Sequence, residues 1–158
     1  MILCELVPIT VSLIYYGLRL RKLDPLKITL VEWVTIAAVA SIGRCETFLS
    51  RMAYERIENL IVGSALEIYV KIFTNNFLVL TLTALLKELY LGYVITITAL
   101  VARHISKSYP LSVILGAHTI LELYAYALAL KGSKRSFLKG ILYLLIAAFI
   151  ETYFISVK

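Results

Sequence analysis

The sequence predicts an all-α fold in which about six membrane segments and one amphipathic interfacial helix form a single integral membrane domain over residues 1–158. Hydrophobic residues make up 61% of the chain and the mean hydropathy is +0.89. A soluble domain is about 45–50% apolar, even on a scale that also counts glycine. The apolar residues fall into long runs separated by short basic clusters, which is the pattern that lipid selects. We therefore expect a multi-pass protein of the cell membrane whose first partner is the lipid bilayer.

The first two apolar runs, residues 2–18 and 28–43, predict two membrane helices. Three basic residues follow the first run, and Asp24-Pro25 predicts a turn. The first run has neither a basic leader nor a small-residue cleavage site, so we expect it to be retained as a helix. Glu32 lies within four residues of the end of its run, and we interpret it as an interfacial residue.

A different pattern follows over residues 44–71. Apolar residues recur here at helical spacing among charged ones, which predicts an amphipathic helix that lies at the membrane interface or packs on the bundle.

Four further apolar runs predict the remaining membrane segments: residues 72–86, 89–102, 110–130 and 138–157. The first two of these are too short to cross about 30 Å of hydrocarbon alone. Either these helices extend into the flanking residues, or the two segments form a re-entrant pair. The loops at 19–27 and 131–139 carry four basic residues each, so we expect both on the cytoplasmic side, with both termini outside.

The net charge of +6 does not indicate a nucleic-acid partner, because the basic residues lie at the ends of apolar runs and form no continuous stripe. No phosphate loop, nucleophile elbow or zinc-protease motif is present, so we expect no cofactor. Cys4 and Cys45 lack metal-binding spacing, and free thiols are favoured over a disulfide. The chain has no Gln and three Asn, a composition typical of a thermophilic, archaeal source.

Polar residues inside the apolar runs are the candidates for function, since a carboxylate at the centre of a membrane helix costs about 2.5–3.5 kcal/mol. His118 and Glu122 are four residues apart and share one helix face, as a buried hydrogen bond or as part of a functional site. Glu151 is expected near the depth of His118. Together the three are candidate metal ligands or a proton relay. Asn75 and Asn76 point about 100° apart, so one can reach this face while the other caps a helix start.

The order and spacing of these signals over residues 70–158 resemble the stage II sporulation protein M family. The residues concerned are Phe73-Thr74-Asn75-Asn76, Gly92, His118-Thr119-Ile120-Leu121-Glu122-Leu123 and Ala147-Ala148-Phe149-Ile150-Glu151. Thr119 stands where that family usually has Gly, and Tyr124 where it often has Pro. The resemblance implies an integral membrane protein with its site around Asn76, His118, Glu122 and Glu151. In spore formers the family member anchors a complex that remodels the cell wall, and relatives occur in archaea.

Three functions follow as hypotheses. The first, supported by the resemblance, is a membrane scaffold or membrane-remodelling component that acts through helix–helix contacts with membrane or cell-envelope proteins, or with copies of itself. The second is a small proton-coupled transporter in which His118, Glu122 and Glu151 form the relay. The third is an intramembrane metallohydrolase that uses the same three residues.

Overall fold

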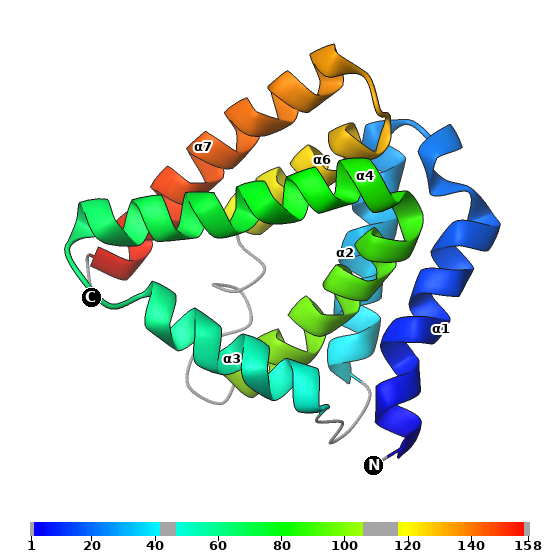
Figure 1. Ribbon diagram of the computed structural model, residues 1–158, viewed down its shortest axis with the longest axis horizontal. Coiled ribbons are helices and arrows are strands. Elements are labelled where there is room, and N and C mark those ends of the chain that lie inside the picture. Colours follow the sequence, from blue (N-terminus) through cyan, green and yellow to red (C-terminus); the bar gives the residue numbers. More distant parts are fainter. Residues whose placement is uncertain (1, 42–46, 106–116, 157–158) are drawn as a thin grey trace.

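The computed structural model describes residues 2–41, 47–105 and 117–156, and in these ranges every regular element is a helix. The all-α prediction is therefore confirmed. In chain order the elements are α1 (Ile2–Leu18), the 3-10 helix η1 (Leu20–Lys22), α2 (Pro25–Ser41), α3 (Phe48–Leu60), α4 (Ala65–Ile105), α6 (Ala117–Leu130) and α7 (Lys134–Ser156), as Figure 1 shows.

Two of the described helices are long and apolar enough to cross a membrane. They are Ala65–Ala102 within α4 and Lys134–Ser156, which is α7. Cys4–Leu18 and Ala117–Leu130 are apolar but shorter. The full set of six membrane segments stays a prediction.

Local polar contacts fix the connection between α1 and α2. Arg19 follows α1 in the left-handed backbone conformation, with φ 51°. The Asp24 carboxylate accepts hydrogen bonds from the backbone N–H groups of Leu26 (3.0 Å) and Lys27 (3.2 Å). Pro25 takes the first helical position of α2, where a missing N–H has no consequence. The turn predicted at Asp24-Pro25 is confirmed.

The amphipathic helix α3 is shorter than the segment 44–71 predicted for it. Thr47 caps its start through reciprocal hydrogen bonds with Ser50, whose hydroxyl accepts from the Thr47 N–H at 3.0 Å. The helix ends at Leu60. The predicted start, residues 44–46, lies outside the described residues.

A second capping box explains why the predicted boundary at residue 71 is wrong. The Ser64 N–H donates to the Glu67 carboxylate at 2.7 Å, and the Glu67 N–H donates to the Ser64 hydroxyl at 3.4 Å. Such reciprocal bonds start a helix. Residues 65–71 therefore begin α4 instead of ending the amphipathic helix.

A break at Lys87 divides α4 into two arms, residues 65–86 and 88–105, which meet at an angle in Figure 1. Lys87 has φ 58° and ψ −140°, a combination that disfavours residues other than glycine. The break coincides with the charged pair predicted to separate the third and fourth runs. The first arm is about 33 Å long at about 1.5 Å per residue, so it is longer than the sequence predicted because it gains residues 65–71.

Helices α6 and α7 form a hairpin. Ser133 caps the start of α7, because its hydroxyl accepts the Ser136 N–H at 3.1 Å, and α7 therefore begins before the predicted residue 138. The start predicted for the fifth run, Pro110, lies outside the described residues.

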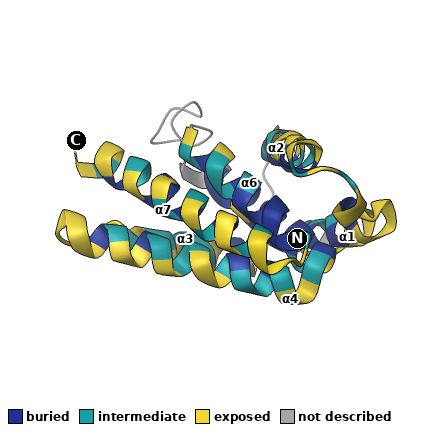
Figure 2. Ribbon diagram, turned by 90° about the horizontal axis from the view of Figure 1, so that it is seen from above, coloured by how far each residue is buried: buried dark blue, intermediate teal, exposed yellow. Residues whose placement is uncertain are grey.

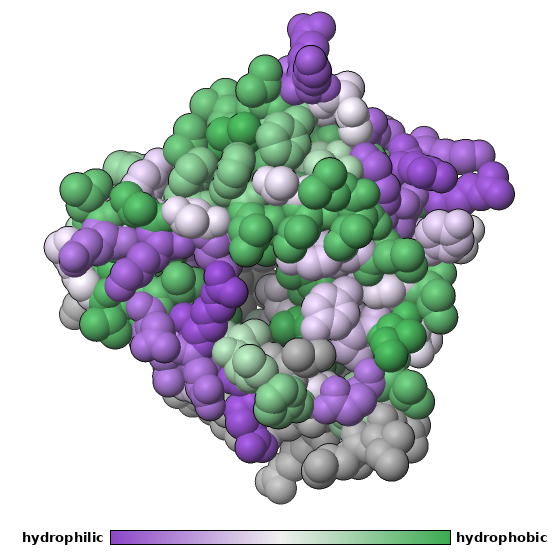
Figure 3. Space-filling model, in the orientation of Figure 1, coloured by the Kyte–Doolittle hydropathy of each residue, from purple (hydrophilic) through white to green (hydrophobic). Residues whose placement is uncertain are grey.

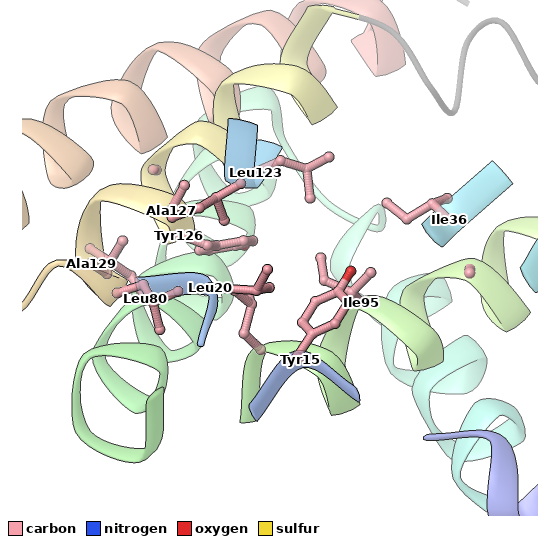
Figure 4. Close-up of a cluster of buried hydrophobic side chains, with 14 of the residues drawn as sticks. Tyr15, Leu20, Ile36, Leu80, Ile95, Leu123, Tyr126, Ala127 and Ala129 are labelled. Atoms are coloured by element: carbon pink, nitrogen blue, oxygen red, sulfur yellow. The ribbon is translucent and has the colours of Figure 1, made fainter. Parts of the chain in front are cut away.

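The core is centred on α6, which packs against α2, α4 and α7. Figure 4 shows Tyr15, Leu20, Ile36 and Ile95 from four other elements converging on the same cluster as Tyr126 of α6. Packing is also close between α1 and α4. A Cβ atom on Gly92 would lie 2.6 Å from Ser12 Cα, so only glycine lets these two backbones approach so closely.

The outer faces of the helices are apolar. Leu13 of α1, Leu85 of α4 and Phe149 of α7 are 59%, 69% and 66% exposed, and Figure 2 shows many exposed residues along these three helices, whereas α6 is largely buried. In Figure 3 hydrophobic residues cover much of the upper face, while hydrophilic residues gather at the top, at the upper right and at the lower left, where α3 lies. The bundle therefore presents apolar surface between polar ends.

The two basic loops predicted on the same side lie together. The Lys131 ammonium donates to the backbone carbonyls of Arg21 (2.9 Å) and Leu23, which joins the α6–α7 loop to the α1–α2 connection. Arg21 also pairs with Glu88, just after the break in α4 (Nε to Oε1, 3.4 Å). We call this end of the molecule the basic end.

Cys4 lies in α1, far along the helix from the basic end. It is disulfide-bonded, so the expectation of a free thiol is wrong for Cys4. Cys45 lies outside the described residues.

Candidate functional site

The site contains a series of side-chain hydrogen bonds that links α4 to α6. The Asn75 side-chain amide donates to the Asn76 carbonyl oxygen at 3.3 Å, and the Asn76 amide donates to the Glu122 carboxyl. Both asparagines lie in the middle of the first arm of α4, which begins at Ala65. Asn76 therefore reaches the Glu122 face, whereas the helix-capping role expected for the other asparagine is wrong.

Glu151 of α7 completes the carboxyl pair. The hairpin brings it close enough to Glu122 for the two carboxyls to interact electrostatically. No salt bridge to either carboxyl occurs among the residues that the structure describes. Two neighbouring carboxylates without a cation repel each other, and sharing one proton relieves the repulsion.

His118 is placed differently from the prediction. Its Nδ1 atom is buried and has no hydrogen-bond partner among the described residues. The predicted bond from the imidazole to Glu122 is not among the hydrogen bonds of these residues, where Glu122 accepts from Asn76 instead.

The three candidate metal ligands are not assembled into one group. Within residues 2–41, 47–105 and 117–156, no three His, Cys, Asp or Glu side chains are grouped so that they could hold a metal ion. Glu122 and Glu151 therefore form a carboxyl pair, and the His118 imidazole does not join them as a third metal ligand.

A third carboxyl, Glu32 of α2, was misplaced by sequence reasoning. It is 0% exposed, and neither of its oxygens has a hydrogen-bond partner in the described part of the chain. The sequence did contain a signal for the burial of Glu32. Glu32 lies on the same helix face as Ile28, Ile36 and Val39, all of which are buried. The interpretation of Glu32 as interfacial is wrong because this face of α2 packs into the core.

Two tyrosine side chains interact electrostatically with these carboxyls. Tyr126 follows Glu122 by one turn of α6, is buried, and is within electrostatic range of Glu122, Glu151 and Glu32. Tyr15 is also within range of Glu32, and its hydroxyl donates to Thr35 at 2.7 Å. Figure 4 shows Tyr126 and Tyr15 directed into one cluster from α6 and α1.

We call Glu32, Glu122, Glu151 and Tyr126 the carboxyl cluster. Its three carboxyls come from three helices, and each interacts electrostatically with the buried phenol of Tyr126. Carboxyl and phenol groups exchange protons, so this arrangement can accept and pass a proton without a metal or an organic cofactor.

Comparisons of the chain with protein-family models, with curated proteins and with solved structures found no match.

Proposed function

We propose that the chain is a multi-pass membrane protein that carries protons through the carboxyl cluster in exchange for, or together with, a small solute. The membrane location is supported by the two long apolar helices. Only 33% and 28% of their most apolar windows are buried inside the bundle, whereas the core helix of a soluble protein would bury most of such a window. The remaining apolar surface suits lipid, and the basic end suits the cytoplasmic headgroups.

The burial of the Glu32 carboxyl without a hydrogen-bond partner among the described residues is the observation that most favours proton transport. A carboxyl that only stabilised the bundle would be expected to have a partner, because a buried polar group without one costs free energy. Glu32 has none among the described residues. Ionisable groups that face the interior of a membrane bundle typically mark proton or ion pathways.

The carboxyl pair adds a second proton-binding position. Glu122 and Glu151 neighbour each other, and Tyr126 is within range of both the pair and Glu32. A proton can therefore reside at the pair or at Glu32, and the Tyr126 phenol interacts with both positions. If a helix moved so that one side of the membrane gained access to the carboxyl pair or to Glu32, proton transfer would be coupled to transport of the solute.

Reconstitution of the purified chain into liposomes tests this function. With a pH gradient and a pH-sensitive dye inside, we expect proton flux above that of protein-free liposomes, stimulated by one or more members of a solute panel. Glu122→Gln and Glu151→Gln should each lower the flux to the protein-free level. Glu58→Gln on α3, an exposed carboxyl outside the cluster, is the matched control. Equal flux in all variants, or none in the parent protein, would contradict the proposal.

A scaffold or membrane-remodelling role is the second candidate, and α3 favours it. This amphipathic helix has its main contacts with α4 alone, and Phe48 and Met52 are 70% and 52% exposed. Such a helix suits the membrane interface or a partner helix. The resemblance to the stage II sporulation protein M family points the same way. Purification from native membranes that gave neither an oligomer nor a reproducible partner, in the parent protein and in Phe48→Ser alike, would remove this support.

A further inference from the structure

A cleft of about 340 Å³ opens at the basic end, between the break in α4 and the loop that joins α6 to α7. Figure 1 shows the bend of α4 beside this loop. Lys87, Gly132, Ser133 and Lys134 line one part of the cleft, and Phe137 and Leu138 are among the apolar residues that line the rest. The cleft thus combines two cations with an apolar wall.

The two cations of the cleft lack acidic partners. The acidic residues near this end are already paired: Glu88 with Arg21 at 3.4 Å, and Asp24 with Lys27 at 3.7 Å. Among the described residues, neither Lys87 nor Lys134 takes part in a salt bridge. The cleft therefore holds positive charge that the protein itself does not neutralise.

Each lysine of the cleft occupies an unusual position in the local structure. Lys134 is the first residue of α7, and the positive end of the helix dipole disfavours a cation there. Lys87 has a strained backbone, with φ 58°, and strain of this kind persists where the surroundings or a function require it. Its ammonium lies against Gly132, where a Cβ atom would be 3.0 Å from Nζ. An anion between the two lysines would offset the unfavourable charge at the start of α7.

We infer that this cleft binds the phosphate headgroup of an anionic phospholipid. About 340 Å³ is too small for a whole lipid but suits a headgroup. The acyl chains would leave along Phe137 and Leu138, toward the exposed apolar surface of α7. Basic pockets between membrane helices recognise anionic headgroups by this combination of charge and apolar contact. The inference is independent of the proton pathway, because the carboxyl cluster contributes no residue to the cleft.

Lipid binding to the full chain in neutral detergent, followed by native mass spectrometry, tests the inference. We expect phosphatidylglycerol to bind more tightly than phosphatidylcholine. Lys134→Ala should weaken phosphatidylglycerol binding about five-fold, the effect of about one cationic residue near an anionic lipid. Lys139→Ala, an exposed lysine of α7 outside the cleft, is the matched control and should leave binding unchanged. An equal loss in both variants would overturn the site in favour of a diffuse positive field.

Lys87→Gly separates binding from folding. Glycine tolerates the backbone conformation of residue 87, so this variant should be at least as stable to heat as the parent protein while it binds phosphatidylglycerol about five-fold more weakly. Full lipid binding by this variant would overturn the role of Lys87. A competition arm distinguishes the source of the phosphate: if inorganic phosphate displaces the lipid at equal concentration, the ligand is a soluble anion and the lipid assignment is wrong.

Discussion

Replacing Glu32 with methionine should make the protein more stable and less active. The side chain is 0% exposed, and neither oxygen has a hydrogen-bond partner among the described residues. A buried polar group left without a partner costs about 1–3 kcal/mol. Methionine has a flexible apolar side chain that adapts to irregular core spaces, so Glu32→Met removes this cost without opening a large cavity.

The expected gain in the free energy of unfolding is therefore about 1–3 kcal/mol. For a chain of this size each kcal/mol shifts the midpoint of thermal unfolding by about 2–4 °C. The assay is thermal unfolding in a fixed detergent, beside proton flux in liposomes. Glu32→Gln is the companion variant. It keeps a buried polar group, so it should gain little stability, but it can no longer bind a proton and should lose flux as Glu32→Met does.

Two results would refute this reasoning. If Glu32→Met unfolds at a lower temperature than the parent protein, the carboxyl stabilises the bundle and the cost assigned to it is wrong. If Glu32→Met is more stable and keeps its full proton flux, Glu32 is buried without serving the pathway. A gain in stability joined to a loss of activity is what a functional polar group in a core produces.

Three further substitutions have definite expected outcomes. Asn76→Ala removes the hydrogen bond to Glu122 and should lower the free energy of unfolding by about 0.6 kcal/mol, and by no more than about 1.7 kcal/mol. A double-mutant cycle with Glu122→Ala, measured by thermal unfolding, should show that the effects of the two substitutions are not additive. Gly92→Ala places a Cβ atom 2.6 Å from Ser12 Cα and should cost about 1–3 kcal/mol in denaturant unfolding, whereas an unchanged midpoint would show that α1 can shift. Lys87→Gly relieves a positive φ and should raise the thermal midpoint by the equivalent of about 1 kcal/mol.

The helices themselves could be predicted from the sequence because their limits are set locally. The run that became α1 ends where basic residues begin, and Asp24-Pro25 starts α2 through bonds within four residues. The break at Lys87 falls at Lys87-Glu88, the charged pair that separates the third and fourth apolar runs. In each case residues close in the sequence determine where the helix begins or ends, so the sequence alone contains the information.

The boundary between α3 and α4 was also set locally, but its signal was overlooked. Gly63 adopts φ +135°, and Ser64 and Glu67 have the spacing of a capping box. The helical recurrence of apolar residues continues across this point and hid the turn. Hydrophobic periodicity was given more weight than capping, and here capping decides the helix limits.

The candidate site was only partly predictable because its composition depends on tertiary packing. Spacing within one helix placed His118 and Glu122 on one face, but it could not reveal that Asn76 would bond Glu122 from another helix. Nor could it reveal that the face of α2 bearing Glu32 would pack against the core. A carboxyl near the end of an apolar run is interfacial in an isolated helix, whereas the packing of α2 determines its surroundings in the bundle.

Glu122 and Glu32 are held differently within one bundle, and their substitutions should therefore affect stability differently. Glu122 accepts a hydrogen bond from Asn76 and joins two helices, so disrupting that bond should destabilise the protein. Glu32 has no such partner among the described residues, so removing it should stabilise the protein. If the cluster existed only to hold the helices together, both substitutions would lower stability. Opposite signs at two carboxyls that interact with the same phenol would support a proton pathway, because Glu32 would then be kept at a cost in stability that only a function explains.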